Sequence, residues 1–161
     1  MFKKYILPLF LSFLITFSAA FIGSAFTSKS IANWYQFLNK PSFAPPNWLF
    51  APVWTILFLM MAIAVFLVWQ KRKAIPIKTA LILYLVQLIL NAFWSVIFFG
   101  FRNPALAFFE IIVLWLLILF TLMNFYKINK IAGFLFLPYL LWVSFATILN
   151  LSIWLLNEAT R

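Results

Sequence analysis

The 161-residue chain has no cysteine, no histidine and no aspartate, and its two acidic residues are Glu110 and Glu158. Without cysteine there are no disulfides and no thiol chemistry. Without histidine, zinc sites of the usual kind and imidazole acid–base catalysis are excluded. A two-carboxylate mechanism would need both glutamates, from different helices, and is therefore disfavoured. We accordingly expect no metal site.

The abundant residues are apolar. Hydrophobic residues make up 67% of the chain, and the mean hydropathy is +1.10, whereas a soluble domain is about half apolar. The formal charge of +10 would also fit a nucleic-acid-binding protein. The basic residues lie between apolar runs, however, so membrane topology explains them better. We expect a lipid bilayer, and no nucleic acid, as the surroundings of this chain.

Five apolar runs are each long enough to cross about 30 Å of hydrocarbon, which takes about 20 helical residues. They are residues 5–26, 47–69, 79–101, 105–126 and 131–156. The sequence thus predicts an all-α integral membrane fold, with residues 1–161 forming one five-transmembrane-helix domain. A cleaved signal peptide is the alternative for the first run, because Ser18-Ala19-Ala20 resembles a cleavage site. The apolar run continues to Phe26, which favours a retained span.

The charges between the spans predict an orientation. Eight cations share the side of the N-terminus: Lys3, Lys4, Lys71, Arg72, Lys73, Lys78, Lys127 and Lys130. Four share the other side: Lys29, Lys40, Arg102 and Arg161. The positive-inside rule places the N-terminus in the cytoplasm and residues 27–46 outside, in what we expect to be a bacterial cell membrane. The apolar residues and prolines of 27–46 predict a packed lid, with a short interfacial helix over residues 33–38.

Polar and aromatic side chains gather on one face of three spans. At about 100° per residue, the second span groups Asn47, Ala51, Trp54, Phe58, Met61 and Val65; the third groups Tyr84, Gln87, Asn91, Trp94, Ser95 and Phe98; the fifth groups Tyr139, Trp142, Ala146, Leu149, Asn150, Ile153 and Asn157. Amides at membrane depth need protein, water or a ligand as partner. The residues alone leave two interpretations open, interhelical hydrogen bonding or a ligand pocket.

Two further features lie within spans. Ser12, Thr16, Ala20 and Ser24 recur every four residues, which predicts a close approach by another helix.

Glu110 lies about five residues into the fourth span. An intramembrane acid is a functional candidate, but its place near a helix end allows snorkelling or a hydrogen bond to a loop, which favours a structural role.

Short motifs also follow one another along nearly the whole chain. They are Trp34-Tyr35, Lys40-Pro41-Ser42-Phe43-Ala44-Pro45-Pro46-Asn47-Trp48, Pro52-Val53-Trp54, Gln87-Leu88 with Asn91 and Trp94, Phe98-Phe99-Gly100-Phe101-Arg102, Glu110, Pro138-Tyr139-Leu140-Leu141-Trp142, Phe145-Ala146-Thr147 and Leu149-Asn150. Together they resemble the TspO/MBR family of membrane proteins. The resemblance implies a five-helix bundle, often a homodimer, with a pocket under the first loop that binds porphyrins and drug-like aromatic ligands.

The resemblance also implies which residues form that pocket. Trp54 and Trp142 would face each other across it, and Asn91, Trp94, Ala146 and Asn150 would help to line it. We add three residues from the faces named above: Ala51, Phe58 and Tyr139. The cholesterol-recognition segment of animal members is missing, since Leu151 and Leu155 stand at its positions, so sterol binding there is doubtful.

Three functions are compatible with this resemblance. The leading hypothesis is a membrane receptor for porphyrin-type tetrapyrroles. The macrocycle would be a ligand and not a cofactor, because strong axial iron ligands are absent. The alternatives are light- and oxygen-dependent porphyrin breakdown, with Trp54 and Trp142 as the catalytic pair, and transport of porphyrin or another small molecule. Transport is disfavoured because the sequence has no internal repeat.

Overall fold

The computed structural model describes residues 3–158 and shows, within them, helices and no strand. The elements are α1 (Lys3–Asn33), the 3-10 turn η1 (Tyr35–Phe37), α2 (Asn47–Gln70), α3 (Lys78–Ser95), the π-helical turn η2 (Val96–Gly100), α4 (Pro104–Ile128) and α5 (Lys130–Glu158). All five α-helical segments are long and apolar enough to cross a membrane, which confirms the predicted fold class. Arg161, one of the cations counted above, lies outside the described residues.

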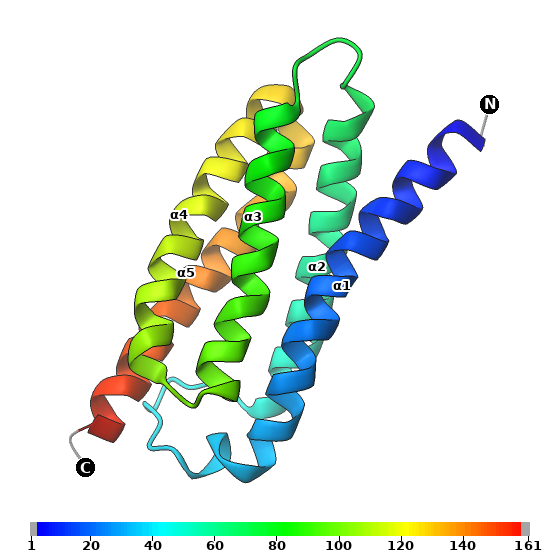
Figure 1. Cartoon of the computed structure of the whole chain (residues 1–161). Coiled ribbons are helices and arrows are strands. Elements are labelled where there is room, and N and C mark those ends of the chain that lie inside the picture. The colour runs from blue at the N-terminus through cyan, green and yellow to red at the C-terminus, as the bar shows by residue number, and fades with distance from the viewer. Residues whose placement is uncertain (1–2, 159–161) are drawn as a thin grey trace.

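The helices form one bundle in which α4 pairs with α5 and α3, while α1 packs on α2 and α3. Figure 1 shows the N-terminal half of α1 diverging from the other helices. The loop of residues 34–46 lies at the opposite end of the bundle, close to the end of α5. This end of the molecule holds the cavity described below.

The first helix is longer than predicted. It continues to Asn33, seven residues beyond the expected end at Phe26. The hydroxyls of this last part bond to backbone, from Thr27 Oγ1 to the Gly23 carbonyl and from Ser30 Oγ to the Phe99 carbonyl, both at 3.0 Å. The apolar run indicates which residues contact lipid. The helix can continue beyond that run as long as its backbone and side-chain polar groups have hydrogen-bond partners.

Two other local predictions need correction. The interfacial helix expected over residues 33–38 is a single 3-10 turn, Tyr35–Phe37. The third span does not run as one α-helix, because it changes to a π-turn at Val96, where Phe101 N–H bonds to the Val96 carbonyl at 2.8 Å. A Cβ on Gly100 would lie 2.9 Å from the Phe26 ring, so glycine permits the close packing of α1 on this turn.

The small-residue stripe of α1 has two halves with different surroundings. Ser12 and Thr16 are buried, and Thr16 Oγ1 shares a 2.5 Å hydrogen bond with the Tyr84 hydroxyl of α3. The predicted close approach of a helix is thus present here. Ala20 and Ser24 instead line the cavity. Their small side chains leave space where the first half of the stripe is packed.

Candidate functional site

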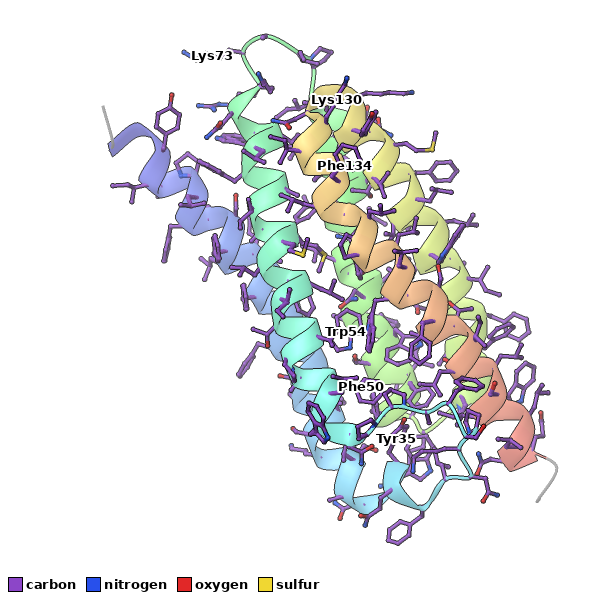
Figure 2. All side chains as sticks on the ribbon, turned by 180° about the vertical axis from the view of Figure 1, so that it is seen from behind. Tyr35, Phe50, Trp54, Lys73, Lys130 and Phe134 are labelled. Carbon is purple, nitrogen blue, oxygen red and sulfur yellow. The ribbon has the colours of Figure 1, made fainter. Side chains whose placement is uncertain are left out.

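A cavity of about 600 Å³ lies between the helices at the loop end of the bundle. Its walls come from α1, α2, α3 with η2, and α5, and Tyr35 closes it from the loop. Figure 2 shows Trp54, Phe50 and Tyr35 in succession toward that end, with Lys73 and Lys130 at the other. The lining includes eight of the nine predicted site residues: Ala51, Trp54, Phe58, Asn91, Trp94, Trp142, Ala146 and Asn150. Whether they bind a ligand remains a prediction.

Trp54 and Trp142 approach the cavity from different helices. The Trp54 ring lies 5.6 Å from the ring of Phe58, and the Trp142 ring lies 6.0 Å from that of Phe50 and 5.5 Å from that of Phe145. Both indoles are half-buried, and neither N–H donates a hydrogen bond within residues 3–158. Two flat aromatic surfaces with free donors therefore border the same space.

Trp94 and Asn150 are tied to each other. The Trp94 indole N–H donates to Asn150 Oδ1 at 3.1 Å, and the Asn150 amide donates to the Pro104 carbonyl at 2.7 Å. Both polar ends of Asn150 are thus used within the protein. The sequence left two interpretations open, interhelical hydrogen bonding or a ligand pocket. At Asn150 the structure shows an interhelical hydrogen bond in the wall of a cavity.

Tyr139 is the predicted site residue that does not line the cavity. Its side chain is 0% exposed, behind Trp54, with 6.1 Å between the two rings. Its hydroxyl accepts a hydrogen bond from Asn91 Nδ2 at 2.9 Å and donates one to Gln87 Oε1 at 3.1 Å. Asn91 lines the cavity and bonds to the Tyr139 hydroxyl, whereas Tyr139 does not line it. Tyr139 could therefore influence a ligand only through Asn91.

The loop of residues 34–46 is packed over this end of the bundle. Tyr35 is 4% exposed, and its ring lies 5.7 Å from that of Phe99. Asn39 exchanges two hydrogen bonds with Asn157 of α5, at 3.0 and 2.9 Å. The loop is therefore packed and not a loose tether, and its action as a lid stays a prediction.

The loop also carries a charge close to the cavity. The Lys40 ammonium lies 4.8 Å from the centre of the Tyr35 ring. Burial raises the pKa of Tyr35 to about 12, so its hydroxyl is neutral at physiological pH. A positive charge thus lies over the uncharged ring of Tyr35, one of the residues that line the cavity.

Glu110 of α4 is partly buried, and its two carboxyl oxygens are buried without a hydrogen-bond partner among the described residues. Of the two structural roles expected from the sequence, the hydrogen bond to a loop is therefore not present. The amide nitrogen of Gln87 on α3 is likewise buried without a partner.

Comparison with known proteins agrees with this architecture. The sequence model of the TspO/MBR family matches residues 12–155. The chain belongs to this family. A Tryptophan-rich protein TspO from Chlorobaculum tepidum is 42% identical over 159 residues, covering 96% of this chain and 99% of the relative. One from Archaeoglobus fulgidus is 40% identical, covering 94% and 98%. A Translocator protein from Homo sapiens is 36% identical, covering 88% and 85%.

Membership of the TspO/MBR family, together with five apolar helices, makes the chain a multi-pass integral membrane protein. Exposed apolar side chains on the helices, such as Ile6, Ile56 and Phe109, are suited to contact with lipid. The lipid bilayer that the composition predicted is thus the environment of the fold.

Sequence reasoning missed several residues that line the cavity of this TspO/MBR chain. They include Ala20, Ser24, Tyr35, Phe50 and Phe99. The α1 residues carried a signal, the small-residue stripe, which was interpreted as a packing surface only. Tyr35 also carried one, because an aromatic pair in a loop is too apolar for a solvated linker. Phe50 and Phe99 lie among many phenylalanines, and nothing in the sequence distinguishes them.

Proposed function

We propose that this membrane protein binds porphyrin-type tetrapyrroles and related flat aromatic ligands in the cavity between its helices. The observation that carries the proposal is the pair of indoles, Trp54 and Trp142, which border one space of about 600 Å³ with free N–H groups. Stacking on an aromatic ring adds about 0.5–1.5 kcal/mol per pair beyond the burial of area. A flat apolar macrocycle gains from both terms.

Charge supports the same class of ligand. A tetrapyrrole with carboxylate side chains has an apolar centre and an anionic edge. Lys40, above the ring of Tyr35, which lines the cavity, would attract that edge while the ring system enters the cavity. We further propose that the loop end of the bundle faces away from the cytoplasm and that the N-terminus is cytoplasmic, because the lysine-rich connections, marked by Lys73 and Lys130 in Figure 2, lie at the other end.

A second candidate is light-dependent porphyrin breakdown with dioxygen as the oxidant. The supporting observation is again the shared position of Trp54 and Trp142, because indoles are the side chains most readily oxidised by one electron here. In this reading an indole would supply an electron to the light-excited macrocycle, and dioxygen would take up an electron in turn. Loss of porphyrin absorbance in light and air, but not in the dark, would favour this candidate.

The binding proposal is tested by filling the cavity. Protein in lipid nanodiscs is titrated with protoporphyrin IX, and the change in porphyrin absorbance gives the affinity. Ala146→Phe puts a large ring into the cavity, and Ile148→Phe, two residues away on the same helix at a site 58% exposed to lipid, is the matched control. We expect Ala146→Phe to weaken binding by about tenfold or more, and Ile148→Phe to leave it within about twofold. Equal affinity in both variants would reject the cavity as the site.

A further inference from the structure

Three side chains form a hydrogen-bonded chain that runs away from the cavity. Asn91 Nδ2 donates to the Tyr139 hydroxyl at 2.9 Å, and this hydroxyl donates to Gln87 Oε1 at 3.1 Å. All three residues are buried, and Gln87 and Tyr139 are 0% exposed. Asn91 donates, Tyr139 accepts and donates, and Gln87 accepts, so both hydrogen bonds run in one direction and the orientation of one end determines that of the other.

The inner end of this chain meets an unpaired group. Among the described residues, Gln87 Nε2 is a buried donor without a partner, and both carboxyl oxygens of Glu110 are buried acceptors without one. Gln87 lies on α3 and Glu110 on α4, which are neighbouring helices. On α4, Glu110 stands three residues after Ala107 and four before Leu114, both of which are buried in the core.

Tyr139 provides the link between these two groups. Tyr139 lies on α5, which packs against α4, the helix that carries Glu110, and the Tyr139 hydroxyl is bonded to the Gln87 side chain. Leaving a buried amide donor and a buried carboxyl unpaired is costly. One buried water between Gln87 Nε2 and the Glu110 carboxyl would satisfy both groups.

That pairing fixes which atom Asn91 presents to the cavity. A carboxyl keeps an acceptor oxygen whether or not it is protonated, so Gln87 turns its N–H toward Glu110 and its oxygen toward Tyr139. Tyr139 then accepts from Asn91 Nδ2, which leaves Asn91 Oδ1 on the cavity side. This oxygen accepts no hydrogen bond within residues 3–158. Asn150, the other cavity amide, is occupied at both ends.

We infer that Glu110 is a positioning residue that sets the hydrogen-bond polarity of the cavity, so that Asn91 Oδ1 selects ligands bearing an N–H or O–H donor. The inference rests on the proposed binding function and names the ligand chemistry of the same site. A pyrrolic N–H, an indole-like N–H or a hydroxyl satisfies this acceptor. A ligand of equal shape that lacks the donor leaves the amide oxygen unpaired when it displaces water.

Two flat tricyclic probes of nearly equal size test the selectivity. Carbazole carries a ring N–H, and dibenzofuran has an oxygen in its place. Their affinities are measured on the full chain in lipid nanodiscs. We expect the wild type to prefer carbazole by about tenfold, the value of one hydrogen bond. If neither probe enters the cavity, the proposed function fails. If both bind equally well, the inference about polarity fails while the proposed function stands.

The role of Glu110 is tested by exchanging the two side chains. In Glu110→Gln the new amide can donate or accept, so the preference should fall to about twofold or less while dibenzofuran binds as in the wild type. In the double variant Gln87→Glu/Glu110→Gln, the carboxylate introduced at position 87 accepts from Tyr139 again, and the preference should return. A purely structural role would weaken both probes equally and would not be rescued by the exchange.

Two further variants keep the test decisive. Tyr139→Phe interrupts the chain without touching Glu110 and should abolish the preference in the same way. Glu158→Gln alters the other acid of the chain, which is exposed at the end of α5, and should leave the preference unchanged. A tenfold preference that survives both Glu110→Gln and Tyr139→Phe would overturn the inference.

Discussion

The Trp94 indole N–H donates a 3.1 Å hydrogen bond to Asn150 Oδ1, which joins α3 to α5 along the wall of the cavity. Asn150 continues the connection to α4 through the Pro104 carbonyl. Three helices thus meet at one amide that is 1% exposed. The hydrogen bond to Asn150 also holds the Trp94 ring at the cavity surface. The shape of the cavity therefore depends on a hydrogen bond within the protein.

Replacing this amide should destabilise the bundle. Asn150→Ala leaves the Trp94 N–H and the Pro104 carbonyl without their partner, and we expect a loss of about 1–3 kcal/mol in the free energy of unfolding. Thermal unfolding in detergent, followed by circular dichroism, measures the change. Asn124→Ala is the control, because Asn124 bonds only to the Phe120 carbonyl of its own helix. Equal effects of the two substitutions would show that the connection between the helices contributes little.

The loop should be held down by Asn157. Asn157→Ala removes both hydrogen bonds to the Asn39 backbone, so we expect faster amide hydrogen exchange in residues 38–44 and nearly unchanged exchange in α2 and α3. Ser152→Ala serves as the control, because Ser152 bonds to Ile148 within α5. Unchanged exchange in the loop of the Asn157 variant would mean that aromatic packing alone holds the lid.

The stability that the buried, neutral Tyr35 contributes to the fold should fall at strongly alkaline pH. Burial raises the pKa of Tyr35 from 10.0 to about 12, so the folded protein favours the neutral phenol. The stabilisation is fully present below pH 10 and is lost as the pH rises through 12. Tyrosinate absorbance of the wild type minus that of Tyr35→Phe should titrate near pH 12. A midpoint near 10 would show that the ring is not buried in the lipid-embedded protein.

The sequence was sufficient to predict the five spans and the aromatic faces of α2, α3 and α5. Long apolar runs have one solution in lipid, the helix, and residue spacing then assigns side chains to faces. Spacing placed Trp54, Asn91 and Trp142 on these faces, and the resemblance to the TspO/MBR family identified them as pocket residues. The boundaries were harder, because hydropathy reports contact with lipid and α1 continues seven residues past its apolar run.

Hydrogen-bond partners could not be predicted in the same way. Which side chain meets Asn150 depends on the rotation and depth of α3 relative to α5, to within a few ångströms, and spacing within one helix does not contain that information. The same holds for Tyr139, which shares a face with Trp142 in the sequence but lies behind the cavity wall.

Replacing both cavity tryptophans should separate binding from chemistry. Phenylalanine keeps a stackable ring but lacks the indole N–H and is harder to oxidise. For Trp54→Phe/Trp142→Phe we expect protoporphyrin IX affinity to fall by about 1–2 kcal/mol. If the indoles support light-driven breakdown, the rate of porphyrin loss in light and air should collapse while most binding remains. Unchanged affinity together with an unchanged rate of loss would place the site elsewhere.

The most direct test of ligand binding in the cavity is a structure of the protein in lipid nanodiscs with protoporphyrin IX bound. We predict that the macrocycle lies between the helices, with ring atoms in van der Waals contact with both Trp54 and Trp142 and with a carboxylate toward Lys40. A macrocycle bound on the lipid-facing side of the helices, with the space between the two indoles unfilled, would contradict the proposal.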